Sequence, residues 1–161
     1  IETGPGGTGA LRIAGDFLAR HFGDKPIWLS EPTWANHPKV FEAAGLQVET
    51  YPYFDAATNG LDEEALLAAL GHIPAGHIVL LHGCCHNPTG VSPSPQTWER
   101  LAALVAERPL LPPLALAHPA PRHGLPGAAP APPALFPTGP ALPLAPSSRH
   151  TYALHPAPLV P

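Results

Sequence analysis

The stretch HIVLLHGCCHNPTG, residues 77–90, decides the fold of this chain of 161 residues. Its first part, residues 77–82, is a continuous apolar run of the kind that forms a buried parallel strand. The rest is a polar loop in which Asn87-Pro88 is typical of a tight turn with a cis peptide bond. Ligands of open parallel sheets bind beyond the carboxyl ends of the strands, so we expect this loop to border a binding site.

Helices and strands alternate on both sides of that stretch. The spacing of apolar residues predicts helices over residues 8–22, 36–44, 61–70 and 94–105 and strands over 27–29 and 46–53. Asn36 and Ser94 are expected to cap their helices, Gly45 to end the second helix, and Asn59-Gly60 to form a turn. Such alternation predicts a layered α/β domain with a mainly parallel sheet.

Proline and charge divide the chain into two compositions. Of its 25 prolines, sixteen lie in residues 109–161, whereas all twelve Asp and Glu residues lie in residues 1–108. We therefore expect a partial domain over residues 1–108 and a Pro/Ala-rich irregular tail over residues 109–161. One hypothesis for the tail is a change of reading frame near Arg108; the alternative is a Pro-rich ligand for SH3-type or WW-type modules.

Composition also excludes several classes of protein. No apolar run reaches the length of a membrane span, and no secretory signal is visible. A net charge of −4 without a basic block argues against a nucleic-acid partner. The adjacent Cys84 and Cys85 make a poor disulfide framework, which favours a cytoplasmic protein. The start at Ile1 and the absence of Met predict a fragment.

Two loops offer groups that could bind an anion or a planar ring. Gly4–Gly9 directly precedes a predicted helix, where backbone N–H groups and the Thr8 hydroxyl could hold an anion; the alternative is a flexible start of the helix. Trp34 follows the first predicted strand, where its indole could stack on a planar ring while His37 donates a hydrogen bond. The alternative is that Trp34 is a core residue and His37 only begins a helix.

The loop after the apolar run contains four side chains that could ligate a metal. They are His82, Cys84, Cys85 and His86. Adjacent cysteines do not easily reach one tetrahedral centre, since zinc sites usually separate them by two or more residues. We therefore expect no metal at this loop.

Taken together, these loops resemble the class I pyridoxal-phosphate-dependent aminotransferases, specifically the aspartate and aromatic amino acid branch. The resemblance rests on PGGTGAL (residues 5–11), PTWANH (32–37), YPY (51–53) and LLHGCCHNPTG (80–90), and it covers residues 1–108. It implies a partial three-layer αβα unit from the large domain of a fold-type I pyridoxal-phosphate enzyme.

The resemblance also implies a cofactor, its binding residues and its partners. The cofactor would be pyridoxal 5′-phosphate, with Gly6, Gly7 and Thr8 holding its phosphate. Trp34 would stack on the ring and help to position the substrate carboxylate, and Asn87 would bind the phenolic oxygen and the substrate. His37 would lie beneath the partner of the ring nitrogen. The expected partners are an amino acid, a 2-oxo acid and a second subunit of a homodimer, with no nucleic acid or membrane.

Departures from the family pattern put the activity of this chain in doubt. Ala115 and His118 stand where the family has the Asp that pairs with the ring nitrogen and a Tyr. The only lysines are Lys25 and Lys39, neither of which matches the family's imine-forming lysine, and the Arg that binds the substrate carboxylate has no match. We expect a fragment of an aminotransferase specific for aspartate or an aromatic amino acid, without activity as it stands. The alternatives are a non-catalytic pyridoxal-phosphate- or phosphate-binding module and a Pro-rich interaction protein.

Overall fold

The structure is a computed structural model that describes residues 7–84, 86–107, 110 and 114–116. In chain order, its elements are α1 (Gly7–Phe22), β1 (Ile27–Glu31), α2 (Asn36–Ala43), β2 (Val48–Pro52), β3 (Phe54–Asp55), β4 (Gly60–Leu61), α3 (Glu63–His72), β5 (Ile78–Val79), β6 (Leu81–Cys84), α4 (Pro95–Glu107) and β7 (Leu114–Leu116). Helices and strands therefore alternate over most of the described chain, as the apolar spacing predicts.

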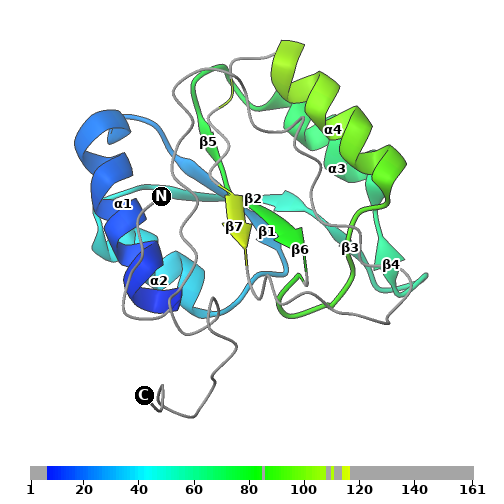
Figure 1. The fold of residues 1–161 in the computed structure, drawn as a ribbon, viewed down its shortest axis with the longest axis horizontal. Helices are drawn as coiled ribbons and strands as arrows, with labels where there is room; N and C mark the ends of the chain where they lie inside the picture. Colours follow the sequence, from blue (N-terminus) through cyan, green and yellow to red (C-terminus); the bar gives the residue numbers. More distant parts are fainter. Residues whose placement is uncertain (1–6, 85, 108–109, 111–113, 117–161) are drawn as a thin grey trace, which may run out of the picture.

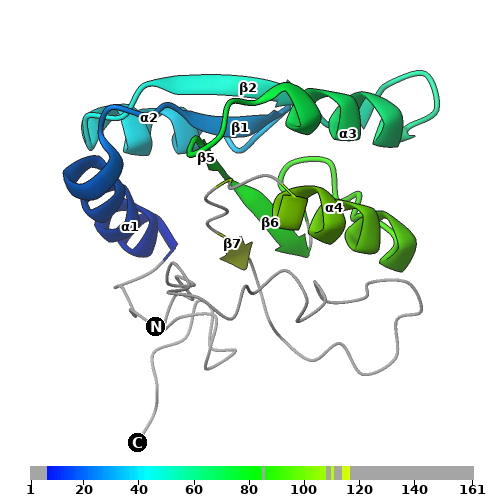
Figure 2. The ribbon, with the colours of Figure 1, turned by 90° about the horizontal axis from the view of Figure 1, so that it is seen from above.

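Parallel pairing dominates the sheets. The central sheet has the strand order β2-β1-β5, and Ile27 of β1 pairs in parallel with Val48 on one side and Ile78 on the other. Strands β6 and β7 form a second parallel pair, which lies between α1 and α4 (Figure 2). Only the small β3–β4 hairpin is antiparallel among the described strands.

The helices cover the central sheet from both sides, so that the domain has three layers. Figure 1 shows α1 and α2 on one side of the strands and α3 and α4 on the other. Alternate residues of β1 face the two helical layers. Ile27 and Leu29 lie in one buried cluster, while Trp28 packs against the other. The cluster beneath α1 and α2 consists of Leu18, Ile27, Leu29, Phe41, Leu46, Ile78 and Leu80. This arrangement confirms the predicted αβα class.

Small residues allow α1 and α2 to lie close together. A Cβ atom at Gly15 would stand 3.0 Å from the Cβ of Ala44, so a larger residue there would push the two helices apart. The chain then leaves α2 through Gly45, whose φ of 93° falls in the left-handed region that favours glycine. Gly45 thus ends the second helix as predicted.

Three local predictions are wrong. The apolar run over residues 77–82 forms two strands of different sheets, β5 and β6, instead of one continuous strand. The other two errors lie at helix starts. Asn36 is the first helical residue of α2, and the N-cap position is taken by Ala35, which forms no side-chain cap. Leu61 belongs to β4 rather than to the third helix, because Asp62 caps α3 by accepting a hydrogen bond from the Ala65 N–H at 3.1 Å. At α3 the apolar spacing extends back to Leu61, which lies before the residue that caps the helix.

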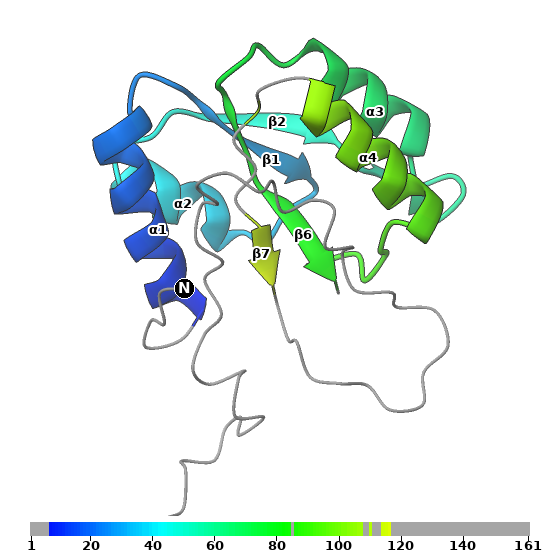
Figure 3. The same cartoon turned by 45° about the horizontal axis from the view of Figure 1, so that its top comes forward.

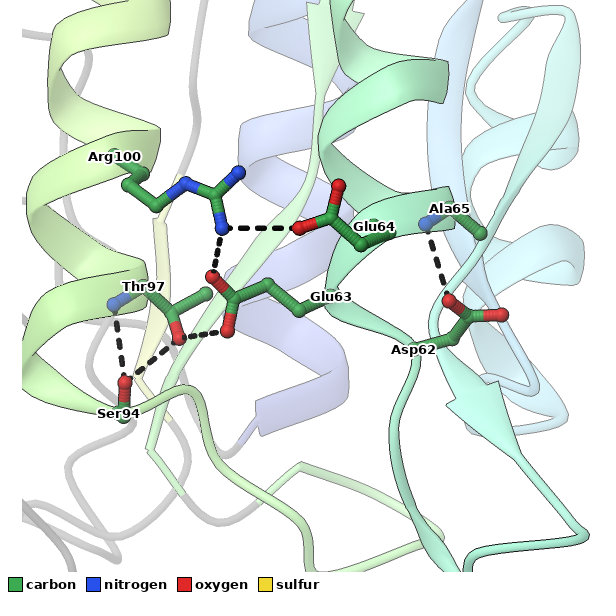
Figure 4. A network of polar contacts seen from close by, with 7 residues as sticks. All are labelled: Asp62, Glu63, Glu64, Ala65, Ser94, Thr97 and Arg100. Atoms are coloured by element: carbon green, nitrogen blue, oxygen red, sulfur yellow. Dashed lines mark hydrogen bonds and ion pairs between the residues drawn. The ribbon is translucent and has the colours of Figure 1, made fainter.

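The start of α4 is as predicted and is also joined to α3. The Ser94 hydroxyl accepts a hydrogen bond of 3.0 Å from the Thr97 N–H, which is the cap expected before Pro95. The Thr97 hydroxyl donates to Glu63 at 2.8 Å, and Arg100 reaches both Glu63 and Glu64 (Figure 4). The first turns of the two helices are therefore held together by one polar network.

The expected irregular tail contains ordered residues. Leu114–Leu116 form β7, with Leu81 paired to Leu114 and His82 paired to Ala115, and Leu110 is buried in the core beneath α3 and α4. The prediction of an irregular chain from residue 109 is thus wrong at these residues, because the backbone of 114–116 pairs with β6 and Leu110 adds to the core. Residues 117–161, including His118, lie outside the described residues.

Within the described part of the chain, every helix is too short or too polar to cross a membrane.

Candidate functional site

Two of the loops singled out by sequence follow the carboxyl ends of parallel strands. Trp34 lies just beyond β1, and Asn87 lies just beyond β6. The N-terminal end of α1, where Gly7 and Thr8 lie, is at the same end of the molecule as the arrowheads of β6 and β7 (Figure 3). The topology therefore gathers the three predicted binding segments toward one edge of the parallel strands.

Five neighbouring rings, which we call the ring row, connect these loops to one another. The ring row runs from Trp34 through His37, His82 and His86 to Tyr53. Successive ring centroids are 5.3, 5.3, 4.5 and 3.8 Å apart. Its members come from the loop after β1, from α2, from β6, from the loop after β6 and from the position that follows β2. The row thereby fixes the loop of Trp34 against the loop of Asn87.

Hydroxyl groups hold two of the three imidazoles in place. The Nδ1 of His37 is hydrogen-bonded to the Thr33 hydroxyl at 2.7 Å. His86 uses both ring nitrogens, with Nε2 hydrogen-bonded to the Ser30 hydroxyl and Nδ1 to the Thr89 hydroxyl, each at 2.8 Å. Since Ser30 is only 1% exposed, this end of the row is shielded from water.

His82 is the exception, because one of its nitrogens has no partner. The backbone N–H of Asn87 donates a long hydrogen bond of 3.4 Å to Nδ1 of His82, which must therefore accept. A neutral imidazole that accepts at Nδ1 carries its proton on Nε2. The Nε2 atom is buried and forms no hydrogen bond with any of the described residues. The site thus contains a buried N–H donor without an acceptor.

The imidazoles of the ring row are uncharged at neutral pH. Burial lowers the pKa of His37 to about 4, and burial and the neighbouring imidazoles lower the pKa of His82 to about 3. Burial, with a smaller effect of His37, lowers the pKa of His86 to about 4. Among the described residues, no carboxylate is hydrogen-bonded to these rings. A neutral imidazole is consequently the form that any ligand would meet.

The residues predicted to bind a cofactor are brought together only in part. Trp34 is half-buried and His37 is buried within the ring row, and the exposed Asn87 joins the row through its backbone bond to His82. Gly7 begins α1 and Thr8 is exposed in its first turn, and no hydrogen bond or ring contact of the described residues connects them to the row. Gly6 lies outside the described residues. The cis peptide bond predicted between Asn87 and Pro88 is confirmed.

Sequence reasoning considered His82 and His86 only as metal ligands and missed Ser30 and Tyr53. In the described chain, no group of three or more His, Cys, Asp or Glu side chains is arranged to hold a metal ion; Cys85 is outside that part. The missed signal is the position of His82 directly after the apolar residues 78–81, within β6, where the imidazole is buried from water and other rings surround it.

Comparison with known proteins agrees with the fold and with these loops. The family model "Aminotransferase class I and II" matches residues 3–130. The chain is 55% identical over 106 residues to the cytoplasmic aspartate aminotransferase of Oryza sativa subsp. japonica, covering 66% of this chain and 26% of that protein. It is 56% identical over 108 residues to the aromatic-amino-acid aminotransferase of Pseudomonas aeruginosa, covering 67% of this chain and 27% of that protein.

Solved structures give the same result. An aromatic amino acid aminotransferase from Burkholderia cenocepacia matches with a TM-score of 0.70 at 51% identity, over 71% of this chain and 29% of that one. An aromatic-amino-acid aminotransferase from Burkholderia pseudomallei, covalently bound to pyridoxal phosphate, matches with a TM-score of 0.69 at 44% identity, over the same shares. The chain spans about a quarter of the length of its curated relatives. Since the family model covers most of its residues, the chain belongs to the class I and II aminotransferase family.

Proposed function

We propose that this chain supplies part of a pyridoxal 5′-phosphate site in an enzyme that moves an amino group between aspartate or an aromatic amino acid and a 2-oxo acid. The supporting observation is the ring row, which holds Trp34 beyond β1 next to the loop of Asn87 beyond β6. Relatives named for aspartate and for aromatic substrates match about equally well, so the proposal includes both substrate classes. We expect the assembled enzyme to be a homodimer.

The ring and phosphate sides of the cofactor fit the residues that are present. Trp34 is half-buried and stands edge-to-face against His37 at 84°, which fixes the indole and leaves surface for stacking on a pyridine ring. The backbone N–H groups in the first turn of α1 favour an anion such as the phosphate, and Thr8 adds a hydroxyl donor. Asn87 is exposed and free to donate to the phenolic oxygen.

The ring-nitrogen side and the covalent attachment do not fit. Position 115, which the resemblance assigns to the partner of the ring nitrogen, is an alanine, and its neighbour in the ladder is the uncharged His82. When bound, pyridoxal phosphate withdraws electrons from an attached amino acid most strongly if a carboxylate keeps its ring nitrogen protonated. The described residues would supply stacking and phosphate contacts, but no such carboxylate.

The two lysines of the chain are poorly placed to form an imine. Lys25 lies before the amino end of β1 and is paired with Asp24 at 2.7 Å, whereas Trp34 lies beyond the carboxyl end. A five-residue strand separates these ends by roughly 16 Å. Lys39 is exposed on α2. We therefore propose that this stretch alone acts as a non-catalytic binding module, and that it holds the cofactor without covalent attachment.

Borohydride trapping tests the proposal. The purified chain is incubated with pyridoxal 5′-phosphate, reduced, digested and mapped by mass spectrometry, while turnover of aspartate with 2-oxoglutarate is measured on the same sample. We expect substoichiometric adducts divided between Lys25 and Lys39, with turnover at the level of a protein-free control. A single stoichiometric lysine adduct together with turnover above that control would show that the chain is catalytic.

A further inference from the structure

The unpartnered nitrogen of His82 gives the proposed site a specific chemical preference. His82 is 8% exposed, and the hydrogen bond from the Asn87 N–H to Nδ1 leaves its Nε2–H as a buried donor without an acceptor. A buried donor without a partner has lost its hydrogen bond to water and gained none in return, which is unfavourable. A ligand atom that can accept a hydrogen bond would remove that cost, whereas a cation would increase it.

Two contacts place this donor next to the expected ring. His82 lies one ring from His37, which in turn lies against Trp34, the residue proposed to stack on the ligand. His82 is also paired with Ala115 in the β6–β7 ladder, at the position that the resemblance assigns to the partner of the ring nitrogen. The donor therefore belongs to the residue beside position 115, the position that the resemblance assigns to the partner of the ring nitrogen.

No negative charge of the described residues offsets the donor. The two neighbouring imidazoles, those of His37 and His86, are hydrogen-bonded to hydroxyl groups, and among the described residues no carboxylate is bonded to either. Charged side chains on the elements packed against the row are all exposed: Glu31 on β1, Lys39 and Glu42 on α2, and Glu49 on β2. The environment of His82 thus favours a neutral acceptor over a cation.

We propose that this site selects pyridine-type phosphates whose ring nitrogen is unprotonated, an inference that rests on the proposed function. The Nε2–H of His82 donates a hydrogen bond to that nitrogen, directly or through one water molecule. The family pattern would instead stabilise a protonated ring nitrogen through the carboxylate at position 115. Replacement of that residue by alanine thus changes the preferred protonation state of the ligand.

Two ligands that differ at the ring nitrogen test this preference. Dissociation constants are measured by equilibrium dialysis at pH 8 for pyridoxal 5′-phosphate and for N-methylpyridoxal 5′-phosphate, whose ring nitrogen is permanently cationic. We expect the native chain to bind the unmethylated compound at least tenfold more tightly. Ala115→Asp should reverse the preference, and the matched surface change Ala103→Asp on α4 should preserve it. Because aspartate is larger than alanine, a reversal cannot come from relief of a clash with the methyl group.

A second variant keeps the test independent of the folding of Ala115→Asp. His82→Leu removes the donor, so we expect the two dissociation constants to become equal within threefold. In parallel, ¹⁵N NMR of the native chain at pH 7 should show His82 as the neutral tautomer protonated at Nε2. Equal affinities in the native chain, or tighter binding of the methylated cation, would overturn the inference while leaving the proposed function intact. If neither compound binds, both the proposed function and the inference fail.

Discussion

The imidazole of His86 lies face to face with the phenol ring of Tyr53, with ring centroids 3.8 Å apart and ring planes 11° apart. Tyr53 also donates from its hydroxyl to the Val91 carbonyl at 2.8 Å. The loop that carries Asn87 is thus held at both ends by a residue that follows β2. Stacking and hydrogen bonding together explain how a glycine- and proline-rich loop keeps one conformation beside the proposed site.

Ser30 is expected to be important for that loop. Ser30→Ala leaves Nε2 of His86 buried without its 2.8 Å partner, which should lower the free energy of unfolding by about 1–3 kcal/mol. Urea unfolding followed by circular dichroism measures the loss. Thr58→Ala, which removes an exposed hydroxyl bonded to Asp55, is the matched control and should cost less than about 1 kcal/mol. Equal losses in the two variants would contradict this role of Ser30.

Acid should destabilise the domain through the ring row. The pKa values of His37, His82 and His86 lie at about 3–4 in the folded chain, against an ordinary value of 6.5. The unfolded chain therefore takes up protons first as pH falls. The contribution of the neutral rings to the free energy of unfolding is complete above about pH 6.5 and is lost as pH falls toward about 4. Each ring lowers the free energy of unfolding by up to about 1.4 kcal/mol per pH unit in this range.

Urea unfolding between pH 7.5 and 4.5 measures this dependence. His86→Gln should make the slope of unfolding free energy against pH shallower, because one of the three depressed pKa values disappears. His72→Gln, on the exposed surface of α3, should leave the slope as in the native chain. A native chain whose stability does not change over this range would show that the imidazoles are not buried in neutral form.

The network between α3 and α4 should depend on its buried hydroxyl more than on its exposed charge. Thr97 is 1% exposed and links Ser94 to Glu63, so Thr97→Val should lower the free energy of unfolding by about 1–2 kcal/mol. Arg100→Gln removes a half-exposed ion pair and should cost less than about 1 kcal/mol. Chemical denaturation measures the free energy of unfolding of both variants. A larger decrease for Arg100→Gln than for Thr97→Val would contradict the prediction.

Much of the fold can be predicted from sequence because local signals agree with it. Gly45 and Ser94 mark helix ends correctly, and the apolar run over residues 77–82 is extended chain, although it is divided between β5 and β6 of two sheets. Asn36 shows the limit of such signals, since it has a favourable side chain for capping but the chain enters the helix one residue earlier. Cap positions depend on where the preceding loop leaves the sheet, which no local pattern encodes.

The site is less predictable than the fold because it is made of long-range contacts. Trp34 and Asn87 could be singled out by their positions after strands, yet the rings that join them, His37 and His82, lie far apart in the sequence. The unpartnered nitrogen of His82 depends on a backbone bond from Asn87 and on the pairing of β6 with β7. The latter pairing lies in a stretch whose composition predicts an irregular chain.

Equilibrium dialysis of pyridoxal 5′-phosphate against the native chain, Trp34→Leu and Trp28→Leu tests the central claim most directly. Trp28 is itself a residue of β1, but it packs against the core cluster beneath α3 and α4 and donates a hydrogen bond to His77. We predict saturable binding of one equivalent by the native chain, weakened roughly three- to tenfold by Trp34→Leu through the loss of stacking, and unchanged by Trp28→Leu. Absence of saturable binding, or equal affinity of the native chain and Trp34→Leu, would contradict the account.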